Sequence, residues 1–206
     1  MGNAAMYGLL LRAIQSYLRE TFGALVWARI LRLADQPPEG FEPMLPYDAQ
    51  VLRRLITVAA RELDRPLDPI LEDVGTFIVS APSHRPLRRL LRFGGASFSD
   101  FLHSLEELPD RARLALPGLE LPQISLAECV AGQFRLEVAT PLPALLPIAL
   151  GALRAMADDY GALVVIDIEA RPSGRGKAAL RVQLLEAAHS SGQHFALSQQ
   201  EAANGG

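Results

Sequence analysis

The spacing of apolar residues changes near Pro117-Gly118, and this change constrains the fold more than any other feature of the sequence. Before that point apolar side chains recur every three or four residues, and after it they alternate with polar side chains. The first pattern is typical of amphipathic helices, and the second of strands with one buried face. The sequence therefore predicts an α+β protein, with a helical N-terminal half followed by an antiparallel sheet.

The helical half is divided by glycine, proline and short polar stretches. Gly23 is expected to end the first helix, Asp48 to cap a later one, and Ser97 or Ser99 to cap the last. Residues 35–46 are rich in proline and are predicted to form a loop. The expected helices are Ala4–Phe22, Ala24–Ala34, Val51–Leu63, Ile70–Val79, Arg85–Arg92 and a segment that contains Phe101–Leu108.

The second half is predicted to contain about four strands and one inserted helix, Ala144–Tyr160. Arg171–Lys177 is expected to form a hairpin turn, since its Gly-Arg-Gly-Lys sequence lacks the spacing of a phosphate-binding loop. We expect the domain to span residues 1–185, and the polar residues 186–206 to form a disordered tail. Alternation is clear in Phe134–Val138, Ile166–Glu169 and Leu180–Leu184.

The composition narrows the class of protein. The chain has 206 residues, half of them apolar, which suits one globular domain. Lys and Arg number 20 against 23 Asp and Glu, so the net charge of −3 gives no reason to expect nucleic acid as a partner. One cysteine and four histidines argue against a disulfide, a cysteine-rich metal site or a multi-histidine zinc centre. A reducing cytoplasm is the expected location.

Neither a membrane segment nor catalytic machinery is predicted. The most apolar run, residues 138–153, contains three prolines and is shorter than the roughly 20 residues of a membrane span. The N-terminus lacks the basic region and the cleavage site of a secretory signal. We recognise no Ser-His-Asp order, no carboxylate pair and no metal cluster, so we do not expect an enzyme.

Three stretches of the chain together carry a family resemblance. They are MYGLLLRAIQSYLRETFGALVWARIL, YDAQVLRRLITVAARELDRPLDPILEDVG and FSDFLHSLEELPDRARLALPGLELP. In this order they resemble the heme nitric oxide/oxygen binding (H-NOX) domain, over about Met6 to Leu185. The most specific features are the Met-Tyr-Gly start, Trp27 after a valine, Gly75, and the Leu-Pro-Gly that follows the last helix. The resemblance implies a fold that encloses a heme between a helical subdomain and the sheet.

The same resemblance implies that two heme-binding motifs are missing. The family's axial histidine directly follows the Phe-Leu-x-x-Leu-x-x-Leu run, and here Pro109 stands at that position. The family's Tyr-x-Ser-x-Arg clamp for the heme propionates corresponds to Ala139, Pro141 and Pro143, or in a second register to Glu137, Ala139 and Pro141. Proline cannot ligate iron, and the carboxylate of Glu137 would repel a propionate. We therefore expect no heme, although heme is the family's cofactor.

No other side chain is a good replacement ligand. At 100° per residue, His103 falls on the polar face of its helix beside Glu106 and Glu107, away from the pocket. Cys129 is expected to be a small buried hydrophobe. Pro109 should also divide this helix, which we expect to end near Glu107 and to restart with Pro109 in the first turn.

The predicted function follows from this altered site. If the family pocket is open, the expected lining residues are Met6, Leu9, Phe77, Ile78, Phe101, Leu105 and Pro122. The leading hypothesis is a regulatory or protein-interaction module without heme, whose signalling partner is of the kinase or cyclase class by family resemblance. One alternative is a heme-based nitric oxide or oxygen sensor with an unconventional ligand such as His103. A second is a receptor for a small apolar ligand in the former heme cavity.

Overall fold

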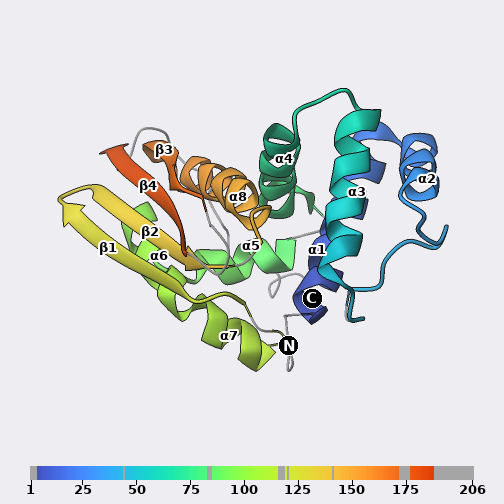
Figure 1. The fold of residues 1–206 in the computed structure, drawn as a ribbon. Coiled ribbons are helices and arrows are strands. Elements are labelled where there is room, and N and C mark those ends of the chain that lie inside the picture. The colour runs from blue at the N-terminus through green and yellow to red at the C-terminus, as the bar shows by residue number, and fades with distance from the viewer. Residues whose placement is uncertain are drawn as a thin grey trace, which may run out of the picture.

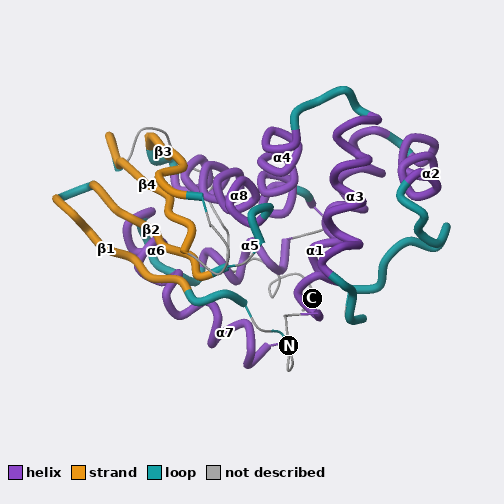
Figure 2. The backbone as a smooth tube through the Cα atoms, viewed as in Figure 1, coloured by secondary structure: helices purple, strands orange, loops and turns teal. Residues whose placement is uncertain are grey.

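The computed structural model describes residues 4–43, 45–82, 85–115, 119, 121–140, 142–171 and 177–187. Helices α1 to α4 form the right-hand part of Figure 1, four strands form the left-hand part, and α8 lies between them. Figure 2 shows the same division by secondary structure. The predicted α+β class, with a helical N-terminal half and an antiparallel sheet, is confirmed.

The helices of the first half lie close to their predicted bounds, because local signals define their ends. Gly23, with a φ of 88°, separates α1 from α2, and the Asp48 carboxylate accepts a 2.7 Å hydrogen bond from the Gln50 backbone N–H at the start of α3. Helix α4 begins three residues earlier than predicted, because Pro69 is tolerated in a first turn. The helices are α1 Ala4–Phe22, α2 Ala24–Leu33, α3 Ala49–Glu62, α4 Leu67–Ser80 and α5 Arg85–Arg92.

The sheet has four antiparallel strands in the order β1-β2-β4-β3. The inserted helix, α8 Leu145–Tyr160, connects β2 to β3 and covers the face that carries Phe134, Leu136 and Val138. One strand that the alternation did not single out is β1, an edge strand that is mostly exposed on both faces. The strands are β1 Ile124–Val130, β2 Gln133–Ala139, β3 Leu163–Ala170 and β4 Lys177–Glu186.

Two apolar clusters make up the core, and α8 contributes to both. The first lies among α1 to α4 and includes Ile148 of α8. The second lies between α8, the sheet and the helix that follows α5, and includes Leu146, Leu150 and Met156 of α8. One helix therefore joins the helical half of the protein to the sheet half.

Glycines allow α4 and α8 to pack with their backbones in direct contact. A Cβ added at Gly75 would overlap the carbonyl oxygen of Ile148, and one added at Gly151 would overlap that of Glu72. The Thr76 hydroxyl of α4 donates a hydrogen bond of 3.3 Å to the Gly151 carbonyl oxygen of α8. The closeness of the two helices therefore depends on the absence of side chains at these two positions.

The C-terminal end of α8 is joined to α5 by an ion pair whose carboxylate is buried. The Arg88 guanidinium makes a bidentate contact with the Asp159 carboxylate, in which the Nε to Oδ2 distance is 2.9 Å and the second pair is Nη2 to Oδ1. The Arg92 guanidinium stacks 3.9 Å from the centre of the Tyr160 ring, whose hydroxyl donates to the Gly95 carbonyl. This end of α8 is thus held by charge as well as by apolar packing.

Two predictions concern residues whose placement is only partly described. The structure describes β4 to its end at Glu186 and then Ala187, whereas the remainder of the expected tail, 188–206, lies outside the described residues. The centre of the expected hairpin turn, 172–176, lies outside them as well, although β3 and β4 do pair antiparallel. Among the described helices, none is both long and apolar enough to cross a bilayer.

The close contact between α4 and α8 at Gly75 and Gly151 generates a stability prediction. Helix propensity alone would make Gly151→Ala favourable by about 1 kcal/mol. Overlap with the Glu72 carbonyl should reverse this sign, and we expect the variant to lose roughly 1–3 kcal/mol of unfolding free energy. Urea denaturation followed by circular dichroism measures the difference. A variant more stable than the parent would show that α4 and α8 do not approach this closely.

Candidate functional site

The helix that carries the family's ligand position is divided in two. Helix α6 Phe98–Ser104 is followed by a single 3₁₀ turn, Leu105–Glu107, and then by α7 Leu108–Ala115. Pro109 is the second residue of α7, where its missing N–H has no intrahelical acceptor to lose, and Asp110 follows it in the same first turn. The predicted break is therefore confirmed. The start of α6 is capped by Ser97, whose side chain forms a reciprocal capping box with Asp100.

Arg111 spans this break. Its Nη2 donates a 2.8 Å hydrogen bond to the carbonyl oxygen of Ser104, the last residue of α6. The guanidinium thus gives the end of α6 a charged hydrogen bond that links α6 to α7 across the 3₁₀ turn. The Nε atom of Arg111 is buried and has no hydrogen-bond partner in the described structure. Nothing in the sequence around Arg111 indicated this role.

Pro109 points into the protein. Its side chain is buried, and Ala112, almost one turn further along α7, belongs to the apolar cluster of the helical half. The family's ligand position therefore lies on an interior face, where a histidine would have access to the core. Because proline offers no side-chain nitrogen, oxygen or sulfur, Pro109 does not fit an iron ligand. Among the residues that the structure describes, no three His, Cys, Asp or Glu side chains are grouped for metal binding.

The expected pocket residues are divided between the two core clusters. Leu9, Phe77 and Ile78 are half-buried and pack on the cluster of the helical half. Phe101 and Leu105, only 2% and 6% exposed, belong to the cluster of the sheet half. These two are enclosed by protein, and the Phe101 ring lies 5.7 Å from that of Phe98 and 5.8 Å from that of Tyr160.

The other two expected lining residues add little to this arrangement. Pro122 is half-buried just before β1, and the side chain of Met6 lies outside the described residues. The structure thus brings Leu9, Phe77 and Ile78 to one cluster and Phe101 and Leu105 to the other, with no cluster that contains all five.

The two candidate replacement ligands are both on the surface. His103 is exposed, as its position on the polar face predicted, and its ring meets the Phe134 ring edge-on at 5.8 Å. The expectation that Cys129 is buried is wrong, because it is exposed on the edge strand β1. A strand with one neighbour and little cover on either face does not bury its small apolar residues.

The clamp positions carry a charge network of a different kind. Residues that alternate with the buried Leu136 and Val138 project from the opposite face of the sheet, and Glu137 is one of them. Its carboxylate pairs with Lys177 at 2.7 Å and with Arg135, which also contacts Glu169 at 3.2 Å. Hydrogen bonds from Lys177 and then Arg135 lower the pKa of the Glu137 carboxyl. The Glu137 carboxylate is therefore paired with one cation of its own strand and one of the neighbouring strand.

The remaining clamp positions supply no polar side chain. Ala139 and Pro143 are exposed, and Pro141 lies outside the described residues. Neither register thus provides the hydroxyl and guanidinium groups that a heme propionate would need. Together with Pro109, the residues present do not fit heme in the manner of the family, and we derive no chemistry through an iron centre.

The Arg111 hydrogen bond predicts that replacing Arg111 costs more unfolding free energy than replacing its neighbour Arg113. Arg111→Ala removes a charged hydrogen bond at the helix break and should cost roughly 1.5–3 kcal/mol of unfolding free energy. Arg113→Ala is the matched control, because its pair with Asp110 is exposed and worth about 0.5 kcal/mol or less. Urea denaturation of both variants gives the comparison. Equal losses would mean that Arg111 does not support the break.

The Glu137 network predicts a pH dependence. Because the folded-state pKa of this carboxyl is lowered, its contribution to stability is present above the unfolded pKa of roughly 4.3 and is lost as the pH falls through the folded value. We expect Lys177→Met to raise the pKa of Glu137, and Lys177→Arg to leave it low. Carboxyl chemical shifts followed by NMR across the acid range measure both. An unchanged pKa of Glu137 in Lys177→Met would show that Lys177 does not lower it.

Sequence comparisons identify the family of this chain. The haem-NO-binding (HNOB) family matches residues 7–168. The soluble guanylate cyclase gcy-31 of Caenorhabditis elegans is 24% identical over 117 residues, which is 57% of this chain and 17% of that protein. The soluble guanylate cyclase 89Db of Drosophila melanogaster is 22% identical over 121 residues, or 59% of this chain and 18% of that protein. The matched region is thus under a fifth of each relative's length.

Solved structures show the same fold. A mutant of the T. Tengcongensis H-NOX superposes with a TM-score of 0.74 at 15% identity, covering 88% of this chain and 99% of the other. An H-NOX protein from S. oneidensis gives a TM-score of 0.74 at 16% identity, covering 87% and 96%. The family is one of sensor domains rather than catalytic domains, and the chain belongs to it: this is a haem-NO-binding, or H-NOX, domain.

Proposed function

We propose that this H-NOX domain has lost axial heme ligation and works as a regulatory, protein-interaction module. The observation that carries the proposal is Pro109, buried at the ligand position and placed in the first turn of a new helix. A heme there would have no protein nitrogen for its iron. Its propionates would meet no hydroxyl or guanidinium at Ala139 or Pro143, and Glu137 is already paired.

The divided helix also supports the proposal that the domain no longer works as a heme sensor. In a sensor whose iron is bound by the protein, movement of the ligand must pass into the helix that bears it. Here the 3₁₀ turn and Pro109 separate α6 from α7, and Arg111 fixes the joint. A signal that began at iron would reach a break rather than a continuous helix.

The names of the relatives support a proposed partner class. They are named soluble guanylate cyclases, and the region shared with this chain is a small part of their length. We propose that this domain acts on a signalling enzyme of the cyclase or kinase class, either in the same polypeptide or as a separate protein. A cytoplasmic location agrees with relatives of that name.

A second candidate function is binding of a small apolar molecule. The half-buried Leu9, Phe77 and Ile78 favour it, because they leave apolar surface on the helical half only partly covered. Mass spectrometry of the denatured, freshly isolated protein tests this candidate. A stoichiometric lipid or other apolar molecule would support it over an unliganded module, and a clean spectrum would exclude it for the isolated protein.

Reconstitution with hemin followed by nitric oxide titration of the ferrous protein tests the main proposal. We expect weak, nonspecific hemin uptake from apolar contact alone and no five-coordinate, histidine-ligated ferrous spectrum. Pro109→His should not restore full occupancy, since the propionate clamp is missing as well. Stoichiometric ferrous heme that binds nitric oxide and disappears in His103→Ala would replace the proposal by the sensor alternative. Glu107→Ala, an exposed change on the same helical segment, is the control.

A further inference from the structure

Many of the cations of this protein are paired, and two that are unpaired among the described residues lie on the same face of α3. Ion pairs join ten lysine and arginine side chains to carboxylates in the described structure. Arg53 and Arg61 of α3 have no such partner among the described residues. Between them Arg54 makes only a long contact of 3.4 Å with Asp35, and both side chains are largely exposed. Breaking a surface pair of this kind costs about 1 kcal/mol or less.

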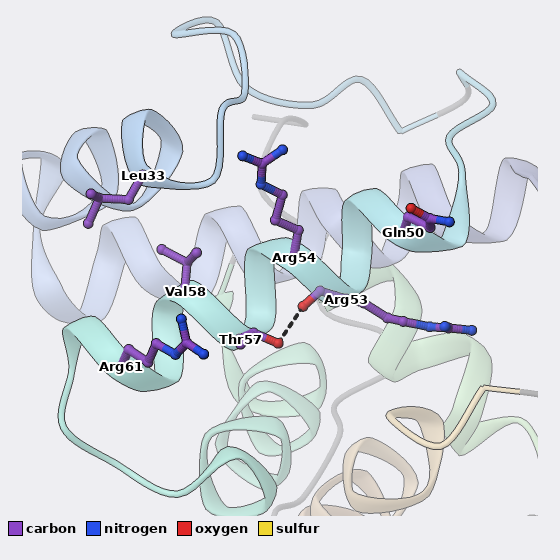
Figure 3. Close-up of a pocket in the computed structure, with 7 residues that line it drawn as sticks. All are labelled: Leu33, Gln50, Arg53, Arg54, Thr57, Val58 and Arg61. Carbon is purple, nitrogen blue, oxygen red and sulfur yellow. Dashed lines mark hydrogen bonds between the residues drawn. The ribbon is translucent and has the colours of Figure 1, made fainter.

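These arginines line one side of an open groove between α2 and α3. The groove has a volume of about 480 Å³, and Figure 3 shows the side chains that surround it. Its polar lining comes from Arg53, Arg54 and Arg61, with Gln50 and Thr57. Its apolar lining comes from Val58 of α3 and from Leu33 of α2, which is 50% exposed. We call this the α2–α3 groove.

The opposite face of α3 fixes the direction of the arginines. Leu52, Leu55, Ile56 and Ala59 are buried in the helical cluster, so α3 is not free to rotate. At 100° per residue the groove residues of α3 occupy an arc of about 140° on its outer side. The Thr57 hydroxyl donates to the Arg53 carbonyl at 2.8 Å, which satisfies the polar group at the centre of the stripe. The cations are thus presented from a rigid support.

We propose that the α2–α3 groove docks an acidic amphipathic helix of a protein partner. Arginine beside a small apolar surface is a typical composition for a protein interface. An amphipathic helix can place leucines on Leu33 and Val58 while its carboxylates reach Arg54 and Arg61. Charge complementarity argues for this occupant, since a chain of net charge −3 attracts a polyanion only at such a local excess of cations.

Other anionic occupants fit less well. Nucleic acid binding depends on many phosphate contacts. The groove groups only three arginines, which is few for such a ligand. An anionic bilayer would meet one exposed leucine and the negative charge of the whole chain. The inference rests on the proposed function in one respect only, namely that the domain acts through contact with another protein.

The test uses a labelled helical peptide of about 18 residues in which glutamates flank a leucine stripe, with fluorescence anisotropy at low and moderate salt. We expect Arg54→Glu/Arg61→Glu to weaken binding about tenfold or more, and Arg54→Gln/Arg61→Gln to weaken it less. The matched control is Arg89→Glu/Arg113→Glu, which changes the net charge equally at exposed positions on α5 and α7 and should bind as the parent does. Circular dichroism confirms that each variant is folded.

Several results would overturn the proposal. These are equal binding by the groove variant and the control variant, equal binding of a scrambled peptide of the same composition, and no binding by the parent protein. Binding of phosphatidylserine vesicles or a DNA duplex that is stronger than peptide binding and is lost in Arg54→Glu/Arg61→Glu would reassign the groove to that ligand. Heme content, measured on the same samples, reports separately on the proposed function, because the peptide assay does not involve heme.

Discussion

The contact between α4 and α8 holds this domain together. Gly75 and Gly151 let the two backbones touch, and the same helix α8 supplies Ile148 to one core cluster and Leu150 to the other. The two halves are therefore joined by polypeptide, through close packing and the Thr76 hydrogen bond. A fold built in this way keeps its halves in register without a prosthetic group between them. Such packing would let the domain keep its fold without a heme, as the proposed function requires.

Proline at the position of the family's ligand has structural consequences, which the neighbouring residues accommodate. A proline in the middle of a helix would cost about 3 kcal/mol or more. The chain avoids most of this by ending α6, inserting a 3₁₀ turn and starting α7 so that Pro109 falls in a first turn. Arg111 then donates a hydrogen bond across the break to the Ser104 carbonyl. The site therefore has its own set of stabilising contacts, distinct from those that a heme would need.

Much of this fold was predictable because the deciding signals are local. Asp48 and Ser97 define helix starts through their own side chains, and the fixed geometry of Pro109 places the break within three residues of its observed position. Strand β1 was less visible, since only its first half alternates, with Ile124 and Leu126 half-buried, and the rest of the strand is exposed. The exposure of Cys129 follows from the same fact and for the same reason escaped prediction.

The site was harder to predict because its contacts join distant parts of the chain. The pairing of Glu137 with Lys177 depends on the register of β2 against β4, which the sequence of neither strand reveals. The bond from Arg111 reaches back seven residues across a broken helix, and nothing in the local sequence distinguishes Arg111 from Arg113. The α2–α3 groove likewise arises only when Leu33 of one helix comes beside Val58 of the next. Such features belong to the tertiary structure.

The heme content of the protein as isolated decides whether this H-NOX domain lacks axial heme ligation. Expression in cells supplied with a heme precursor, followed by pyridine hemochrome analysis of the purified chain, gives moles of heme per mole of protein. We expect far less than one heme per chain and no sharp Soret band. One heme per chain, retained through purification and with a defined axial-ligand spectrum, would contradict it.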